Sequence, residues 1–171
     1  KTVGPLRKNL GLRTFFNLLG PLVNPAKPKF SVIGVYSLEI ARLYQYLLQK
    51  KNEKFTLVHA LDGYDEISLT ADTKIYNPEG EHIFSAEELG FKNIVPESIE
   101  GGATKQEAAQ IFRNILEGKG SESQNAVVIA NAALALKSTG KFGSYETCLQ
   151  KAKESLESGK ALRALELVIN G

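Results

Sequence analysis

Three carboxylates surround a glycine in segment 62–66 (Asp-Gly-Tyr-Asp-Glu), which directly follows the short apolar run 55–61. A β-rich run that leads into acidic residues is typical of a buried strand that ends at a polar site. Ligands of open α/β sheets bind just beyond the carboxyl ends of the strands. Asp62, Asp65 and Glu66 are therefore candidates for holding a cation. Mg²⁺ suits them, because it takes one or two protein carboxylates and completes its shell with water and substrate phosphates.

A solvated surface turn is the competing interpretation of the same residues. Asp-Gly at 62–63 has the chemistry of a tight turn, and carboxylates in loops are mostly exposed without a ligand. The acidic pattern alone leaves both interpretations open.

A strand, a helix and a second strand are expected to position this acidic segment. The β-branched run 30–36 predicts a buried strand, and Ser37 is a plausible N-cap for the helix that follows it. Apolar residues then recur at helical spacing as far as Lys50. The run that begins at Phe55 is the second strand, and the crossover connection predicts that the two strands are parallel neighbours.

The next segments predict a hairpin, one short helix and one edge strand. Strands are expected at 73–77 and 82–84, separated by a loop of about four residues. Ser85 with Glu88 has capping-box spacing and predicts a short helix. Segment 93–99 is expected to be an edge strand, because Pro96 cannot occupy the centre of a sheet.

From residue 101 onward the pattern is helical. Thr104 with Glu107, and Ser121 with Gln124, have the spacing of capping boxes. Segment 126–136 is apolar nearly all round, so we expect a helix buried on most sides, in which Asn131 needs hydrogen-bond partners. Two more helices are expected after it. The predicted fold is α/β, with three layers, a mostly parallel mixed sheet, flanking helices and an all-helical carboxy-terminal third.

Composition limits the class of protein. The 171 residues are 43% hydrophobic, enough for one core, so we expect a single domain over 1–171. A net charge of +2 gives no reason to expect nucleic acid, and no apolar run has the length of a membrane helix. Cys148 is the only cysteine, which fits a reducing compartment and a cytoplasmic protein. The chain begins at Lys1 and contains no Met, which predicts a piece of a longer chain.

Two blocks resemble a known family. Segment 5–25 (Pro-Leu-Arg-Lys-Asn-Leu-Gly-Leu-Arg-Thr-Phe-Phe-Asn-Leu-Leu-Gly-Pro-Leu-Val-Asn-Pro) is similar to the characteristic block of the anthranilate phosphoribosyltransferases. Segment 62–66, Gly-Gly at 101–102 and Asn-Ala-Ala at 131–133 also match that family at the expected distances. The likeness covers essentially the whole chain.

The resemblance implies transfer of a phosphoribosyl group from phosphoribosyl pyrophosphate to the amino group of anthranilate, with pyrophosphate leaving. It implies that Asp65 and Glu66 hold Mg²⁺ and that Arg7 contacts the carboxylate of anthranilate. We assign Asp62 to shaping the loop. No catalytic residue is assigned, because an aromatic amine is already a nucleophile at pH 7 and needs positioning more than a base.

The chain departs from the family in lacking the glycine-rich phosphate loop and the amino-terminal helical domain. We therefore expect this piece to be inactive alone, and the intact enzyme to be a homodimer. A transferase-like protein that binds nucleic acid is one alternative, and a nucleoside phosphorylase relative is another. The nucleic-acid alternative would use the basic cluster Lys1, Arg7, Lys8, Arg13, Lys27 and Lys29, but the retained Asp65 and Glu66 would repel phosphates.

Overall fold

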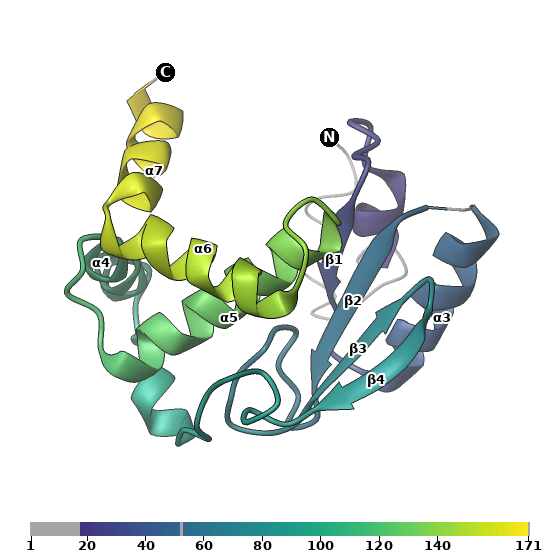
Figure 1. Ribbon diagram of the computed structural model, residues 1–171, viewed down its shortest axis with the longest axis horizontal. Coiled ribbons are helices and arrows are strands. Elements are labelled where there is room, and N and C mark those ends of the chain that lie inside the picture. The colour runs from purple at the N-terminus through teal and green to yellow at the C-terminus, as the bar shows by residue number, and fades with distance from the viewer. Residues whose placement is uncertain (1–17, 52, 171) are drawn as a thin grey trace, which may run out of the picture.

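The computed structural model describes residues 18–51 and 53–170. A four-stranded sheet lies between helix α3 on one face and the carboxy-terminal helices on the other (Figure 1). The predicted α/β architecture with an all-helical carboxy-terminal third is therefore confirmed. The elements, in chain order, are η1 (Gly20–Val23), β1 (Ser31–Gly34), α3 (Leu38–Lys50), β2 (Phe55–Ala60), β3 (Thr73–Asn77), β4 (Gly80–Phe84), η2 (Pro96–Ile99), α4 (Lys105–Leu116), α5 (Glu122–Ser138), α6 (Tyr145–Glu157) and α7 (Lys160–Asn170).

The strands are hydrogen-bonded in the order β1-β2-β3-β4. β1 is parallel to β2, with Ile33 opposite Leu57, which confirms the predicted crossover unit. β3 and β4 form the predicted antiparallel hairpin, but β4 begins at Gly80, which pairs with Asn77, so the loop is shorter than the four residues predicted. The sheet is mixed as expected, but it is less parallel than predicted. Among the described strands, β2–β3 and β3–β4 are antiparallel and only β1–β2 is parallel. A parallel pair needs a crossover, and α3 is the helix that supplies one here.

Strand β2 is buried over its whole length, because helices cover both faces of the sheet. Leu57 packs with Tyr44 of α3 in one core cluster. Val58, on the opposite face, packs with Ala130 of α5 in another. A strand covered on both sides is apolar at successive positions, which explains why run 55–61 does not alternate.

Helix α5 packs against several elements. Its side chains take part in three of the four core clusters, with the sheet, with α4 and α7, and with α6. The capping box predicted at its start is complete: Gln124 N–H donates to Ser121 Oγ at 3.2 Å, and Ser121 N–H donates to Gln124 Oε1 at 3.0 Å. Helix α5 therefore joins the sheet to α4, α6 and α7 through core contacts.

Two further local predictions are wrong. Segment 85–90 forms turns rather than a helix, although Ser85 and Glu88 make both predicted capping-box bonds. One hydrogen-bonded turn is too short to stabilise a helix, and Gly90 has a φ of 84°. Segment 93–99 is not a strand, because Pro96 starts the 3₁₀ helix η2. No helix within residues 18–51 and 53–170 has the length and apolarity to span a bilayer.

Candidate functional site

Asp65 and Glu66 lie where the sequence predicts, in the loop 61–72 that leaves the carboxyl end of β2. In Figure 1 this loop passes beneath the middle of α5. Both side chains are exposed, whereas Ile67, next in the chain, is completely buried. The loop is therefore anchored in the core directly beside two carboxylates that remain accessible to a ligand.

Main-chain hydrogen bonds fold the start of the loop back on β2. Ala60 N–H donates to Tyr64 C=O at 2.9 Å, and Gly63 N–H donates to Ala60 C=O at 2.9 Å. Gly63 has a φ of 105°, a conformation that favours glycine. The tight turn predicted as the competing interpretation is thus present, and it places Asp65 immediately after the turn.

Asp62 shapes the loop, as we expect from the sequence. Its carboxylate accepts hydrogen bonds from Ser68 Oγ, at 3.4 Å, and from Thr70 Oγ1. Both of these hydroxyls belong to the returning side of the loop. The Asp62 side chain therefore joins the two sides of the loop and is already engaged, unlike an open metal ligand.

The loop also contacts the end of the neighbouring parallel strand. A Cβ atom on Gly34 of β1 would lie 2.0 Å from the main-chain oxygen of Asp65. Just beyond Gly34, Val35 N–H donates to Val58 C=O at 3.0 Å, and Val35 C=O is 2.8 Å from Nδ1 of the buried His59. The carboxyl ends of β1 and β2 are thus fixed together beneath the acidic pair.

Asn131 of α5 binds the main chain of Ile67 on both sides. Ile67 N–H donates to Asn131 Oδ1 at 3.0 Å, and Asn131 Nδ2 donates to Ile67 C=O at 2.8 Å. Nδ2 also donates to Val127 C=O at 2.9 Å. The prediction that Asn131 needs hydrogen-bond partners is confirmed.

The two carboxylates influence each other electrostatically. Loss of hydration raises the pKa of Glu66 above its usual value, and the negative charge of Asp65 raises it further. Both effects disfavour a second negative charge at this point of the loop. A bound cation would offset this repulsion. The two carboxylates are therefore more favourable with a divalent ion bound than without one.

The donor set limits which metal would fit. Within residues 18–51 and 53–170, no group of three or more His, Cys, Asp or Glu side chains is placed to hold a metal ion. Two carboxylate ligands do not form the closed site that structural zinc requires. They do fit Mg²⁺, which keeps several waters and shares substrate phosphates. The residues present therefore fit the predicted metal.

Three other residues singled out in the sequence are Arg7, Glu107 and Gly102. Arg7 lies outside the described residues, so its contact with anthranilate stays a prediction. Glu107 makes half of the predicted capping box: its N–H donates to Thr104 Oγ1 at 3.1 Å, but its Oε2 accepts from Ala103 N–H, at 2.7 Å, rather than from Thr104 N–H. Gly102, in the paired glycines, has a φ of 80°.

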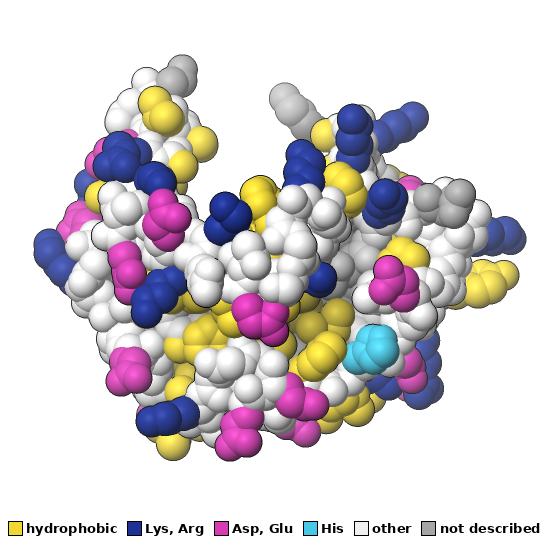
Figure 2. All heavy atoms as spheres, viewed as in Figure 1, with side chains coloured by type: hydrophobic (Ala, Val, Ile, Leu, Met, Phe, Trp, Pro, Cys, Tyr) yellow, Lys and Arg dark blue, Asp and Glu magenta, His cyan; other side chains and the backbone are white. Residues whose placement is uncertain are grey.

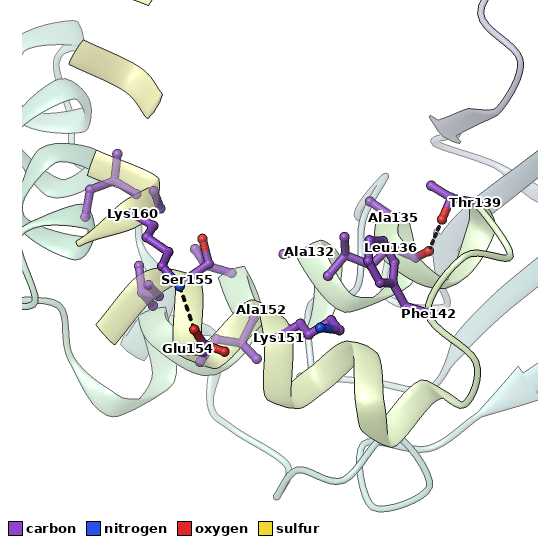
Figure 3. A pocket seen from close by; sticks show the side chains of 15 residues that line it. Ala132, Ala135, Leu136, Thr139, Phe142, Lys151, Ala152, Glu154, Ser155 and Lys160 are labelled. Atoms are coloured by element: carbon purple, nitrogen blue, oxygen red, sulfur yellow. Dashed lines mark hydrogen bonds and ion pairs between the residues drawn. The ribbon is translucent and has the colours of Figure 1, made fainter. Parts of the chain in front are cut away.

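The helices enclose a separate groove of about 690 Å³ between α5, α6 and α7 (Figure 3). Its wall is largely apolar, with Ala132, Leu136 and Phe142 on one side. Two of its polar side chains are paired, since Lys160 Nζ donates to Glu154 Oε1 at 2.6 Å. Neither Asp65 nor Glu66 lines it, so the groove is separate from the acidic pair.

Figure 2 shows Lys and Arg interspersed with Asp and Glu over the helical side of the molecule, with hydrophobic side chains exposed between them. Nucleic-acid binding requires basic side chains concentrated on one face or along one helix. On the face in view, basic side chains gather at the upper right, near the end marked N in Figure 1, and not over the carboxy-terminal helices.

Sequence reasoning missed two contributors to the site. Gly34 contacts the Asp65 carbonyl, and its signal was present, because a glycine among β-branched strand residues often marks a close main-chain approach. Ile67 contributes through its main chain, for which its residue type gives no signal.

Comparison with known proteins gives one family and many close relatives. The family described as "Glycosyl transferase family, a/b domain" matches residues 1–162. Anthranilate phosphoribosyltransferase of Flavobacterium johnsoniae is 51% identical over 97% of this chain and 50% of its own length. The enzyme of that name from Christiangramia forsetii is 50% identical over 94% of this chain and 48% of its own length. The chain thus spans about half the length of these relatives.

Solved structures agree with these sequence matches. The crystal structure of anthranilate phosphoribosyltransferase from Thermus thermophilus superposes with a TM-score of 0.84 at 33% identity, over 96% of this chain and 49% of that one. The Saccharomyces cerevisiae enzyme in complex with PRPP and Mg has a TM-score of 0.83 at 26% identity, over 96% of this chain and 47% of that one. The described fold is therefore also that of solved transferases.

Proposed function

The chain belongs to the glycosyl transferase family, as its a/b domain, and from this we propose that the full-length protein is an anthranilate phosphoribosyltransferase. It transfers the phosphoribosyl group of phosphoribosyl pyrophosphate to anthranilate, a step of tryptophan biosynthesis. The observation that carries the proposal is the 51% identity to a curated enzyme of that name over nearly the whole chain.

Asp65 and Glu66 are the proposed magnesium ligands. Their exposure beside a buried anchor, and the raised pKa of Glu66, support this role. When bound, magnesium stabilises the negative charge that grows on the departing diphosphate. The two residues hold their oxygens at the carboxyl ends of β1 and β2, where a substrate phosphate can complete the coordination.

Arg7 is the proposed contact for the anthranilate carboxylate. A guanidinium group presents two parallel N–H donors that match the two oxygens of a carboxylate. Held in this way, the neutral aromatic amine needs only to be oriented toward the sugar carbon, and no residue of the chain is assigned as a general base.

Residues 1–171 are proposed to form one α/β domain of a longer chain, because the matched relatives are about twice as long. The activity is therefore proposed for the full-length protein, which we expect to be a homodimer in the cytoplasm. Light scattering after size-exclusion chromatography measures the oligomeric state. A monomer at working concentration would contradict this part of the proposal.

The test is a rate measurement on the full-length protein. Anthranilate, phosphoribosyl pyrophosphate and Mg²⁺ together should give pyrophosphate and the ribosylated amine, and omission of any one should stop the reaction. Asp65→Asn and Glu66→Gln should each require more Mg²⁺ for the same rate. Unchanged magnesium dependence in both variants would contradict the metal assignment.

The same assay separates the alternatives. A nucleoside phosphorylase would cleave nucleosides in the presence of phosphate and would not consume anthranilate. A nucleic-acid-binding protein would show no turnover, and it would lose affinity for DNA steeply as salt is added.

A further inference from the structure

We infer that Asn131 is the positioning residue of the acidic pair: its side-chain amide holds the main chain of Ile67 and thereby fixes the direction in which Glu66 and Asp65 present their carboxylates. The inference rests on the proposed function, in which these two acids hold magnesium. It adds a residue from a different element, α5, 64 positions away from the loop in the sequence.

Two hydrogen bonds to one residue fix the loop locally. Ile67 N–H, which donates to Asn131 Oδ1 at 3.0 Å, belongs to the peptide unit that carries the carbonyl of Glu66. Ile67 C=O, which accepts from Asn131 Nδ2 at 2.8 Å, belongs to the following unit. Both peptide planes that flank Ile67 are therefore held, and the first of them is bonded to the Cα atom that carries the Glu66 side chain. A peptide plane cannot rotate without breaking its bond to Asn131.

The amide of Asn131 can adopt only one orientation. Its Nδ2 has two hydrogens, and it donates to both Ile67 C=O and Val127 C=O. Its Oδ1 accepts from Ile67 N–H. Exchanging the amide oxygen and nitrogen would face the oxygen toward two carbonyls and the nitrogen toward an N–H group. The donors and acceptor are thus matched to this one geometry.

The support behind Asn131 is rigid. Helix α5 has 17 residues, a complete capping box and contacts in three core clusters. Ala130, beside Asn131, is fully buried in the cluster that also contains Ile67 and Leu69. Movement of the loop at Ile67 would therefore require movement of the core cluster that contains Ile67 and Ala130.

Other residue types cannot replace this amide. An aspartate would retain an acceptor for Ile67 N–H but would lose both donors, and it would add a further negative charge to the carboxylates of the acidic loop. An alanine would leave the main chain of a fully buried residue without its partners. Groups behind metal ligands commonly change metal affinity 10- to 100-fold when they are removed.

The experiment compares Asn131→Ala with Asn125→Ala in the full-length protein. Asn125 is the matched control, because it is a half-buried asparagine of the same helix whose Nδ2 donates to Gly120 C=O at 3.4 Å, away from the loop. Magnesium affinity is measured by titration in the presence of pyrophosphate, without turnover. Exchange of the Ile67 amide hydrogen is measured by NMR in the metal-free protein, with thermal unfolding of each variant alongside.

The expected result is a loss of magnesium affinity of about 10- to 100-fold in Asn131→Ala, against less than about twofold in Asn125→Ala. Ile67 amide exchange should accelerate by about tenfold in Asn131→Ala alone, since one hydrogen bond is removed. Equal magnesium affinities in Asn131→Ala and Asn125→Ala would overturn the inference, as would unchanged exchange at Ile67.

Asn131→Gln covers the case in which the alanine variant does not fold. It keeps the amide but displaces it by one methylene, so it should fold and still bind magnesium more weakly than the wild type. Wild-type affinity in a folded Asn131→Gln would overturn the inference. Asp65→Asn distinguishes failure of the proposed metal site from failure of the role of Asn131. If Asp65→Asn weakens magnesium binding while Asn131→Ala does not, only the role of Asn131 is contradicted. If Asp65→Asn has no effect, the proposed metal site fails and the role of Asn131 fails with it.

Discussion

Gly34 and Asp65 lie in main-chain contact: a Cβ atom on Gly34 would be 2.0 Å from the Asp65 carbonyl oxygen and 3.1 Å from the Asp65 Cβ. Real Cβ atoms do not approach a carbonyl oxygen so closely. The end of β1 therefore has a second role besides pairing with β2, because it is the surface on which the acidic loop rests. Glycine at 34 is required by this contact rather than by its own backbone angles.

Gly34→Ala should displace the loop and weaken magnesium binding. Insertion of a methyl group into a closely packed place costs about 1–3 kcal/mol, and here the loop is the part that must move. We expect a lower free energy of unfolding by chemical denaturation and at least tenfold weaker magnesium affinity. Gly20→Ala is the control for stability, since no atom lies within 4 Å of the added Cβ. Equal unfolding free energies in the two variants would contradict the prediction.

The parts of the fold that the sequence predicts well depend on local patterns. The Ser121–Gln124 capping box, the antiparallel pairing of β3 with β4 and the helix that follows Ser37 depend on residues a few positions apart. Ser37 Oγ, for example, accepts from Ile40 N–H at 3.4 Å, as an N-cap should. Patterns of this kind are visible in the sequence because the partners are sequence neighbours.

The parts that were not predicted depend on partners that are far apart in sequence. The need of Asn131 for hydrogen bonds follows from its apolar surroundings, but nothing in the sequence indicates that the partner is Ile67. Gly34 and Asp65 are brought together only by the parallel pairing of β1 and β2. Segment 93–99 was predicted wrongly for a different reason: Pro96 suits both an edge strand and the first turn of a helix, and η2 is the one that forms.

Magnesium binding should weaken as the pH falls, beginning above the ordinary titration range of a glutamate. Partial loss of hydration and the charge of Asp65 raise the pKa of Glu66 above 4.5, so a proton competes with the metal at higher pH than usual. Affinity should be greatest above the raised pKa and should fall as the pH drops through it. Titrations across this range, on wild type and Glu66→Gln, measure the effect. The variant should bind more weakly and with less dependence on pH; an identical pH profile would contradict the assignment.

Glu66→Gln should raise the melting temperature of the metal-free protein at neutral pH. Because the folded-state pKa of Glu66 is raised, ionisation of this residue disfavours the folded state above that pKa, and the penalty disappears below 4.5. Glu117→Gln is the opposite case, since hydrogen bonds from Lys119 and Arg113 lower the pKa of Glu117. Its replacement should give no increase. Calorimetry at pH 7 measures both, and a lower melting temperature for Glu66→Gln would contradict the prediction.

Arg7→Lys should raise the KM for anthranilate in the full-length protein. An ammonium group cannot reproduce the two parallel hydrogen bonds of a guanidinium to a carboxylate, although it keeps the charge. The KM for phosphoribosyl pyrophosphate should change less, because that substrate is assigned to Asp65 and Glu66 through magnesium. Steady-state kinetics with each substrate varied in turn measure the difference. Unchanged constants for both substrates would refute the role of Arg7.

Asp62→Ala should separate the shaping of the loop from metal binding. The Asp62 carboxylate accepts hydrogen bonds from Ser68 and Thr70, so its removal should lower the free energy of unfolding by about 1 kcal/mol, the usual net contribution of such bonds. Magnesium affinity should fall less than in Asp65→Ala, because the loop loosens while both proposed ligands remain. Denaturant unfolding and magnesium titration of the two variants provide the comparison. If Asp62→Ala instead loses as much affinity as Asp65→Ala without losing stability, Asp62 is itself a metal ligand, and the site has three carboxylates rather than two.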